Sequence, residues 1–126
     1  MDILKEIGID PEKEDKGDWE KFFGKFEFCV AAWENDAMLK AMSEMDQDLS
    51  EAEDIDQSDA IIARHVIKDW KPFTYDGQDG FAYSPENAVK ILQDKRLRPL
   101  RKRIIRFARR EENYRSKQDQ KAAKNS

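Results

Sequence analysis

Residues 69–92, DWKPFTYDGQDGFAYSPENAVKIL, contain the strongest stop and start signals for secondary structure in this chain. Pro72 disfavours helical geometry at the residue before it, so a helix arriving from the N-terminal side is expected to end there. Twelve positions later, Ser84 is a typical N-cap, Pro85 suits the first helical position, and Glu86 suits the first turn. The stretch therefore predicts a helix end, a loop and a second helix start.

The intervening loop is unusually aromatic. The pairs Asp76-Gly77 and Asp79-Gly80 indicate two turns, because glycine tolerates positive φ. Several large exposed aromatic side chains would favour aggregation, so we expect most of them to fold inward as a lid, with some left for a binding partner. The aromatic partner-binding candidates are Trp70, Phe73, Tyr75, Phe81 and Tyr83.

Four helices are predicted. The first covers residues 36–45 and is capped by Asn35. The second begins after Asp56 or Ser58 and ends before Pro72, because Ile61, Ile62, Val66 and Trp70 share one helical side. The third begins at Ser84. The fourth extends from Pro99 to about Arg115, with Leu100, Ile104, Phe107 and Ala108 as its apolar stripe.

The N-terminal part of the chain has fewer clear signals. Residues 19–33, WEKFFGKFEFCVAAW, match helical spacing at some positions and strand alternation at others. Aromatic and β-branched residues favour strands and glycine weakens a helix, so a hairpin turning near Gly24 is the preferred prediction. Ile3, Leu4, Ile7 and Ile9 suggest one helical turn, and PEKEDKGD reads as a solvated linker.

These elements predict a predominantly α protein with a small β element (α+β), in which a short N-terminal hairpin or strand is followed by about four helices. A length of 126 residues suits a single core. We expect an N-terminal segment at 1–17, one domain at 18–115 and a disordered tail at 116–126.

The charge is divided between the two halves of the chain. Residues 1–60 carry 19 acids and 6 bases, a net of −13, whereas residues 61–126 carry 8 acids and 17 bases, a net of +9. Opposed halves can attract each other within one chain or between copies, so a homo-oligomer is expected. No stretch approaches the ~20 apolar residues of a membrane span, and the first residues lack the basic and apolar regions of a signal peptide. Together these features predict a location in the cytoplasm and no membrane partner.

Catalytic and metal-binding signatures are missing from the sequence. No P-loop, GxGxxG, HExxH or GxSxG motif occurs, and Cys29 and His65 are single members of their types. Asp46, Asp48 and Ser50 alternate like the first ligands of a calcium loop, but the later positions of that loop lack its glycine and its closing glutamate. The sequence predicts no enzyme activity, no cofactor and no metal site.

The basic C-terminal helix supplies the second set of partner-binding candidates: Arg101, Arg103, Arg106 and Arg110. Closely spaced arginines suit phosphates, so a small regulatory protein that binds nucleic acid through this helix is one interpretation. No DNA- or RNA-recognition motif accompanies the charge, which places nucleic acid behind an acidic protein partner.

Trp19 to Arg115 resembles the tail assembly chaperones of lambda-like siphophages with long tails. The resemblance is carried by KFEFCVAAWENDAMLKAM and by IIARHVIKDWKPFTYDGQDGFAYSPENAVKILQD, with Asn113-Tyr114-Arg115 at the end of the last helix. It implies a non-enzymatic protein of the host cell cytoplasm, absent from the mature virion. Such a protein binds the tape measure protein and, through a frameshifted long form, recruits tail tube subunits.

The resemblance also implies that this chain is the short, non-frameshifted form. Ala123-Lys124-Asn125 is compatible with the slippery heptamer A AAA AAC. An alanine codon can end in A, lysine can be encoded by AAA, and asparagine can be encoded by AAC or AAU. We therefore predict a −1 slip at these codons. A chance match is the alternative explanation, since short motifs often occur by chance.

Overall fold

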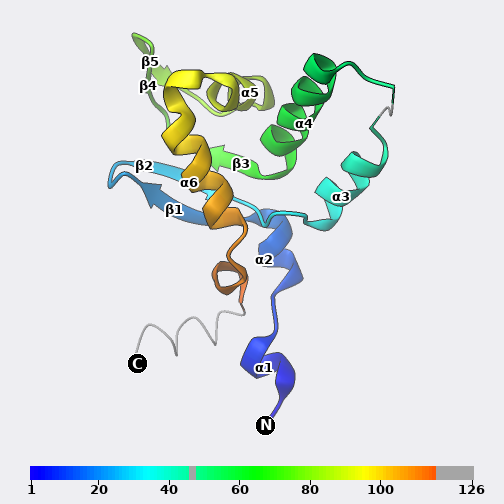
Figure 1. The fold of residues 1–126 in the computed structure, drawn as a ribbon. Helices are drawn as coiled ribbons and strands as arrows, with labels where there is room; N and C mark the ends of the chain where they lie inside the picture. The colour runs from blue at the N-terminus through cyan, green and yellow to red at the C-terminus, as the bar shows by residue number, and fades with distance from the viewer. Residues whose placement is uncertain (46–47, 116–126) are drawn as a thin grey trace.

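A computed structural model describes residues 1–45 and 48–115, and these ranges contain six α-helices and five β-strands (Figure 1). The helices are α1 (Ile3–Ile7), α2 (Pro11–Lys16), α3 (Asp36–Ser43), α4 (Glu51–His65), α5 (Pro85–Gln93) and α6 (Arg98–Ala108). Short 3-10 helices follow at Lys95–Leu97 (η1) and Glu111–Tyr114 (η2). The strands are β1 (Asp18–Phe22), β2 (Phe26–Val30), β3 (Ile67–Trp70), β4 (Phe73–Tyr75) and β5 (Gln78–Phe81).

The strands form two antiparallel sheets. One has the order β1-β2-β3, and the other is the hairpin β4-β5. The predicted hairpin near Gly24 is confirmed, with Phe22 opposite Phe26. Asp76-Gly77 makes the turn of the second hairpin, where Tyr75 pairs with Gln78. Gly80 has a φ of +63° but lies inside β5, so the second predicted turn is wrong.

The predicted fold class is wrong. It placed a short N-terminal hairpin or strand before about four helices, whereas α1 and α2 precede the hairpin and three further strands separate α4 from α5. The fold is a mixed α+β arrangement with two antiparallel sheets. The missed strands are three or four residues long, and strand pairing depends on partners distant in sequence that local propensity does not reveal.

The predicted second helix is displaced at both ends. Helix α4 begins at Glu51, because the Ser50 hydroxyl accepts a hydrogen bond from the Glu53 amide and donates one to the Glu53 carboxylate. It ends at His65, and the residues expected to continue it form β3, which pairs with β2. The acidic residues from Glu51 to Asp56, between the first two predicted helices, are therefore helical. Asp46 lies outside the described residues.

The N-terminal linker prediction is also wrong. Asp10 caps α2 through a hydrogen bond accepted from the Glu12 amide, and Pro11 occupies the first turn. The backbone of this segment is attached to the end of the domain, since the Asp10 amide donates to the Tyr114 carbonyl at 2.9 Å. Ile9 and Arg115 form an isolated antiparallel bridge beside it.

Two of the predicted helix starts are confirmed. Asn35 caps α3 by accepting from the Met38 amide, and Ser84 caps α5 by accepting from the Asn87 amide. The last helix begins near Pro99 as predicted but ends at Ala108, where Asn113 donates its side-chain amide to the Phe107 carbonyl. The predicted disordered tail at 116–126 lies outside the described residues.

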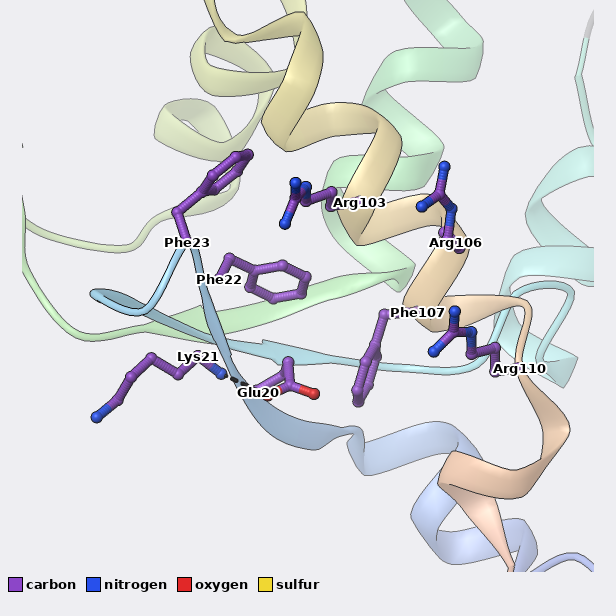
Figure 2. Close-up of a pocket in the computed structure, with 8 residues that line it drawn as sticks. All are labelled: Glu20, Lys21, Phe22, Phe23, Arg103, Arg106, Phe107 and Arg110. Atoms are coloured by element: carbon purple, nitrogen blue, oxygen red, sulfur yellow. Dashed lines mark hydrogen bonds between the residues drawn. The ribbon is translucent and has the colours of Figure 1, made fainter.

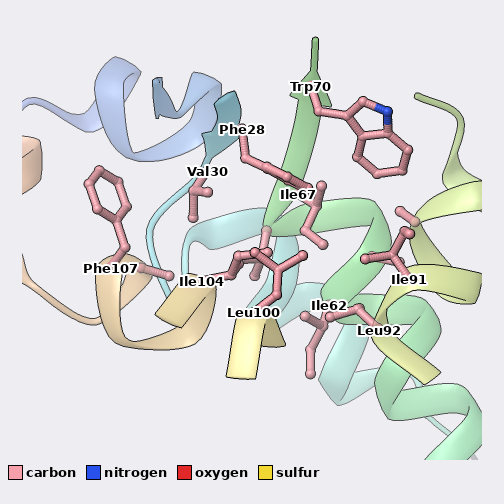
Figure 3. Packing of buried hydrophobic residues seen from close by; sticks show 14 of the residues in the cluster. Phe28, Val30, Ile62, Ile67, Trp70, Ile91, Leu92, Leu100, Ile104 and Phe107 are labelled. Atoms are coloured by element: carbon pink, nitrogen blue, oxygen red, sulfur yellow. The ribbon is translucent and has the colours of Figure 1, made fainter. Parts of the chain in front are cut away.

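The core lies between the three-stranded sheet and helices α4, α5 and α6 (Figure 3). Its fully buried side chains include Phe28 and Val30 of β2, Ile67 of β3 and Ile104 of α6. The stripe predicted for the last helix is confirmed, with Leu100, Ile104, Phe107 and Ala108 all buried. None of the helices in the described part of the chain is long and apolar enough to cross a membrane.

Candidate partner-binding site

The β1-β2 turn presents an exposed aromatic side chain in an unusual backbone conformation. Phe23 and Gly24 both have positive φ, +55° and +68°, and the Lys25 amide donates to the Phe22 carbonyl at 3.1 Å, as in a type I′ turn. Positive φ is common for glycine but uncommon for a residue with a bulky side chain. The Phe23 side chain is nevertheless 45% exposed. The hairpin therefore holds a phenylalanine at the surface despite the backbone strain.

Helix α6 places arginines next to this turn. The Arg103 guanidinium lies over the Phe23 ring, 4.2 Å from its centroid, which is close enough for a cation-π contact. Buried Phe22 packs edge-on against Phe107 of α6 at 6.0 Å, and this contact holds the hairpin to the helix. Figure 2 shows the resulting arrangement of phenylalanine and arginine side chains.

These residues line an open groove of about 380 Å³. We call it the arginine groove, and it consists of Glu20, Lys21, Phe22, Phe23, Arg103, Arg106, Phe107 and Arg110. Four of its side chains are cationic and one is acidic. Within residues 1–45 and 48–115, Arg106 and Arg110 form no ion pair. The groove therefore offers uncompensated positive charge beside an apolar surface.

Arg101, the fourth arginine predicted to bind a partner, has a different environment. Its guanidinium contacts Asp59 of α4 at 2.9 Å and donates to the Leu92 carbonyl at 3.1 Å. Asp59 is buried, so this pair joins α4, α5 and α6 inside the domain. Three of the four predicted arginines lie together in the arginine groove, and Arg101 is part of the internal structure.

The five predicted aromatic residues form a separate cluster, and none of them lines the arginine groove. Trp70 and Phe81 are buried, and the Trp70 indole donates to the Phe81 carbonyl at 2.9 Å. Phe73, Tyr75 and Tyr83 are half-buried against the same core. The Tyr83 hydroxyl donates to the Ile67 carbonyl at 3.0 Å. The structure therefore places these five side chains mainly in internal packing.

A polar contact closes the outer end of the aromatic cluster. The Tyr75 hydroxyl donates to Asp94 at 2.6 Å, and Arg96 forms a salt bridge with the same carboxylate at 2.8 Å. Arg96 and then Tyr75 hold the pKa of Asp94 well below its usual value by hydrogen bonding to the ionised form. The pKa of the Tyr75 hydroxyl is raised, chiefly by its hydrogen bond to Asp94. These shifts are explained by structural contacts between the β4-β5 hairpin and the segment from the end of α5 into η1.

Cys29 and His65 lie in surroundings that suit a structural role rather than a catalytic one. The Cys29 thiol is buried and donates to the Lys16 carbonyl at 3.3 Å, and burial raises its pKa to about 11. A thiol with so high a pKa is a poor nucleophile at neutral pH. Burial lowers the pKa of His65, whose backbone carbonyl accepts a hydrogen bond from Asn35. Within the described residues, no group of three or more His, Cys, Asp or Glu is arranged to hold a metal ion.

Sequence reasoning missed the phenylalanine side of the groove. The dipeptide Phe23-Gly24 sits at the centre of a correctly predicted hairpin, and its position between two pairing strands was the available signal. That Phe23 would meet Arg103 depends on the packing of α6 against β1, which no local pattern encodes.

The fold and the groove define a small α+β protein with a cationic and aromatic surface groove. The family model of the YdaY prophage protein matches residues 31–125, and the chain therefore belongs to the YdaY prophage protein family. It is a phage-derived protein. The groove arginines lie within the matched range, whereas Phe22 and Phe23 precede it. No curated protein and no solved structure matches the chain.

Proposed function

We propose that this protein is a phage tail assembly chaperone that binds the tape measure protein through the arginine groove. The observation that carries the proposal is Phe23, which is 45% exposed at positive φ with Arg103 over its ring. Strained backbone is retained where surrounding structure maintains it, often at binding sites. Arginine and aromatic side chains are also the residue types that dominate binding energy at protein interfaces.

The chemistry of the groove favours an amphipathic segment with acidic side chains. Arg106 lies in the last turn of α6 and Arg110 lies just beyond the end of that helix, and both line the arginine groove, so they can pair with two carboxylates spaced along a bound segment. Phe23 would contact an apolar side chain between them. A long tape measure protein that presents such segments repeatedly would be covered by many copies of the chaperone, and multiple weak contacts would add through avidity.

Support for the tail assembly role comes from two further directions. Membership of a prophage family places the chain among phage-derived proteins. The resemblance of Trp19 to Arg115 to tail assembly chaperones supplies the particular role and its partner. On this proposal the protein acts by binding, in the host cell cytoplasm, without a cofactor, and it is absent from the mature virion.

Co-expression with the tape measure protein of the same prophage tests the proposal. We expect wild-type protein to raise the soluble fraction of the tape measure protein several-fold. Phe23→Ala and Arg106→Glu should each abolish most of this gain, because they remove the apolar and cationic parts of the groove. Trp19→Ala and Arg64→Glu are matched controls on exposed residues outside the groove, and both should behave like wild type.

An equally insoluble tape measure protein with and without this chain would contradict the proposal. If the groove variants solubilised the tape measure protein as well as wild type does, the chaperone role would stand but the arginine groove would not be the binding site. Far-UV circular dichroism and thermal unfolding of each variant separate loss of binding from loss of fold. Both groove substitutions are at exposed positions, so we expect their melting temperatures to match wild type within a few degrees.

The short-form proposal has an independent test in the gene. Residues 123–125 lie outside the described residues, and the proposal for them rests on the resemblance alone. We expect codons 123–125 to contain A AAA AAC or A AAA AAT, with an open frame continuing in the −1 register. The long form would then carry the binding site for tail tube subunits. A nucleotide sequence without that run excludes a slip at this position.

Nucleic acid is the second candidate ligand, because the exposed arginines of α6 also suit phosphates. A shift of DNA or RNA whose affinity falls steeply as salt rises would support a regulatory protein. Substitution of Arg106 should then weaken binding to all sequences similarly and reduce the salt dependence by about one released ion. No mobility shift at low salt would eliminate this candidate.

A further inference from the structure

The N-terminal helix α1 projects from the domain with its apolar side chains uncovered. Ile3, Leu4 and Ile7 are 67%, 71% and 64% exposed, and α1 contains no buried residue. Helical spacing places the three on one side of the helix. Glu6 falls beside that apolar side, whereas Lys5 falls opposite it and Asp2 is the N-cap, whose carboxylate accepts a hydrogen bond from the Leu4 amide. Clustered exposed aliphatic side chains of this kind mark an interaction surface.

A second uncovered apolar surface lies at the other end of the molecule. An open groove of about 530 Å³ runs between α4 and α6 over the end of α5, and we call it the α4–α6 groove. Its aliphatic side chains are Leu92 on the floor, Ile55 on α4 and Ile105 on α6. Ile55 is 54% exposed. The groove therefore offers aliphatic side chains to an aliphatic partner.

The rim of the α4–α6 groove has spare positive charge. Its lining includes Lys95, Arg98 and Lys102, and none of these three forms an ion pair in the described part of the chain.

Most of the acidic charge beside that rim is already engaged. Asp59 and Asp94 are paired with Arg101 and Arg96, and Asp56 accepts a hydrogen bond from Gln93 at 3.1 Å. The rim therefore complements Glu6, the acidic side chain beside the apolar side of α1.

One chain cannot join these two surfaces. Figure 1 shows α1 at the opposite end of the molecule from α5 and the first turn of α4. The backbone beyond α1 is fixed to the end of the domain through the Asp10 amide and the Ile9 bridge to Arg115. Helix α1, which we call the arm, is therefore held away from the α4–α6 groove of its own chain and is free to enter the α4–α6 groove of another copy.

We propose that α1 of one copy docks in the α4–α6 groove of a second copy. The apolar side of α1 covers Ile55, Leu92 and Ile105, and Glu6 faces the basic rim. The two contact surfaces differ, so the interface is heterologous and propagates from copy to copy as an open stack or a ring. The arginine groove has a different lining and remains available in such an assembly.

Sedimentation velocity of the purified full chain over a range of concentrations tests the proposal. We expect wild-type protein to form species larger than a dimer as its concentration rises. Leu4→Asp removes the arm contact and Ile55→Asp removes the groove contact, and each should weaken association at least tenfold. Lys102→Glu should weaken it at least threefold through the rim charge alone. Leu39→Asp, at a 46% exposed position on α3, is the matched control and should associate like wild type.

An equimolar mixture of Leu4→Asp and Ile55→Asp gives the sharpest test. The first variant keeps a working groove and the second keeps a working arm, so the mixture should form 1:1 pairs and stop there. Wild-type protein that stays monomeric at high concentration would overturn the proposal. Variants that associate like wild type would also overturn it, as would a mixture that associates no better than its separate components.

Two features keep the result interpretable. Circular dichroism should show unchanged folds, because the arm and groove substitutions are at exposed positions. The measurement uses this chain alone, so its outcome does not depend on whether the tape measure protein is the partner of the arginine groove.

Discussion

The guanidinium Nη2 of Arg101 lies 2.9 Å from Oδ1 of Asp59, a carboxylate in a residue that is only 4% exposed. This salt bridge connects the acidic helix α4 with the basic helix α6, and so joins the oppositely charged halves of the sequence. The remaining exposed arginines of α6 are not neutralised by α4. The charge division of the chain is therefore only partly satisfied within one copy.

Removing Arg101 is expected to cost more stability than removing any exposed arginine of the same helix. Arg101→Met should lower the free energy of unfolding by about 2–3 kcal/mol, because the buried Asp59 carboxylate loses its partner. The loss is smaller than for a fully buried ion pair because the Arg101 side chain is partly exposed. Arg98→Ala, at an exposed position, should change it by less than about 0.5 kcal/mol. Urea unfolding measures both. A double-mutant cycle with Asp59→Asn that gives no coupling would contradict a stabilising pair.

Gly17 is expected to be intolerant of a side chain. Its φ is +88°, and an added Cβ would lie 2.9 Å from the Val30 carbonyl carbon and 3.0 Å from the Cys29 sulfur. Gly17→Ala should lower the unfolding free energy by roughly 3 kcal/mol, since backbone strain and steric overlap add.

Gly24 provides the matched control for this substitution. It also has positive φ, but nothing lies within 4 Å of its added Cβ. Gly24→Ala should cost only the backbone penalty of about 1–2 kcal/mol. Equal losses in thermal or urea unfolding for the two variants would show that the contact with β2 is unimportant.

Trp70 is expected to contribute to stability rather than to partner binding. Trp70→Phe removes the indole hydrogen bond to the Phe81 carbonyl and leaves a cavity in the core, so we expect a loss of about 2–4 kcal/mol. Trp19→Phe, at a 43% exposed position, should cost less than about 1 kcal/mol. A Trp70→Phe variant of wild-type stability that fails to bind the tape measure protein would move the aromatic cluster into the binding site.

Alkaline pH is expected to destabilise the protein through Cys29. The pKa of the buried thiol is raised from 9.0 to about 11 by burial, with Asp69 and Asp18 adding to the effect. The folded state therefore favours the neutral thiol. This contribution to stability is fully present below pH 9 and is lost as the pH rises toward 11. The difference corresponds to roughly 3 kcal/mol.

Urea unfolding at pH 8 and pH 10.5 measures this loss, with Cys29→Ala as the comparison. The wild-type protein should lose more stability over that interval than the variant. Tyr114, whose pKa is also raised by burial, contributes to the alkaline loss in both proteins, so the comparison isolates the thiol. Parallel pH dependences would show that Cys29 titrates as it does in the unfolded chain.

Helix starts and turns that depend on a few consecutive residues were predicted well from the sequence. Ser84 followed by Pro85 begins α5, Asn35 begins α3, and the glycine-centred hairpin turns near Gly24. Each depends on a cap or a turn whose hydrogen-bonding partners are close in sequence. The Ser50 cap of α4 belongs to the same class and was available in the sequence as Ser-x-x-Glu, although the prediction started that helix too late.

The sequence by itself therefore determined the helix caps, the hairpin turn and the apolar stripe of α6, because these depend on local backbone sterics and periodicity. Only the tertiary structure decided that Ile67–Trp70 is a strand, since β3 requires β2 as its pairing partner. It also decided the roles of the arginines. Arg101 faces buried Asp59, whereas Arg103 meets Phe23, and that difference depends on which element packs against each side of α6.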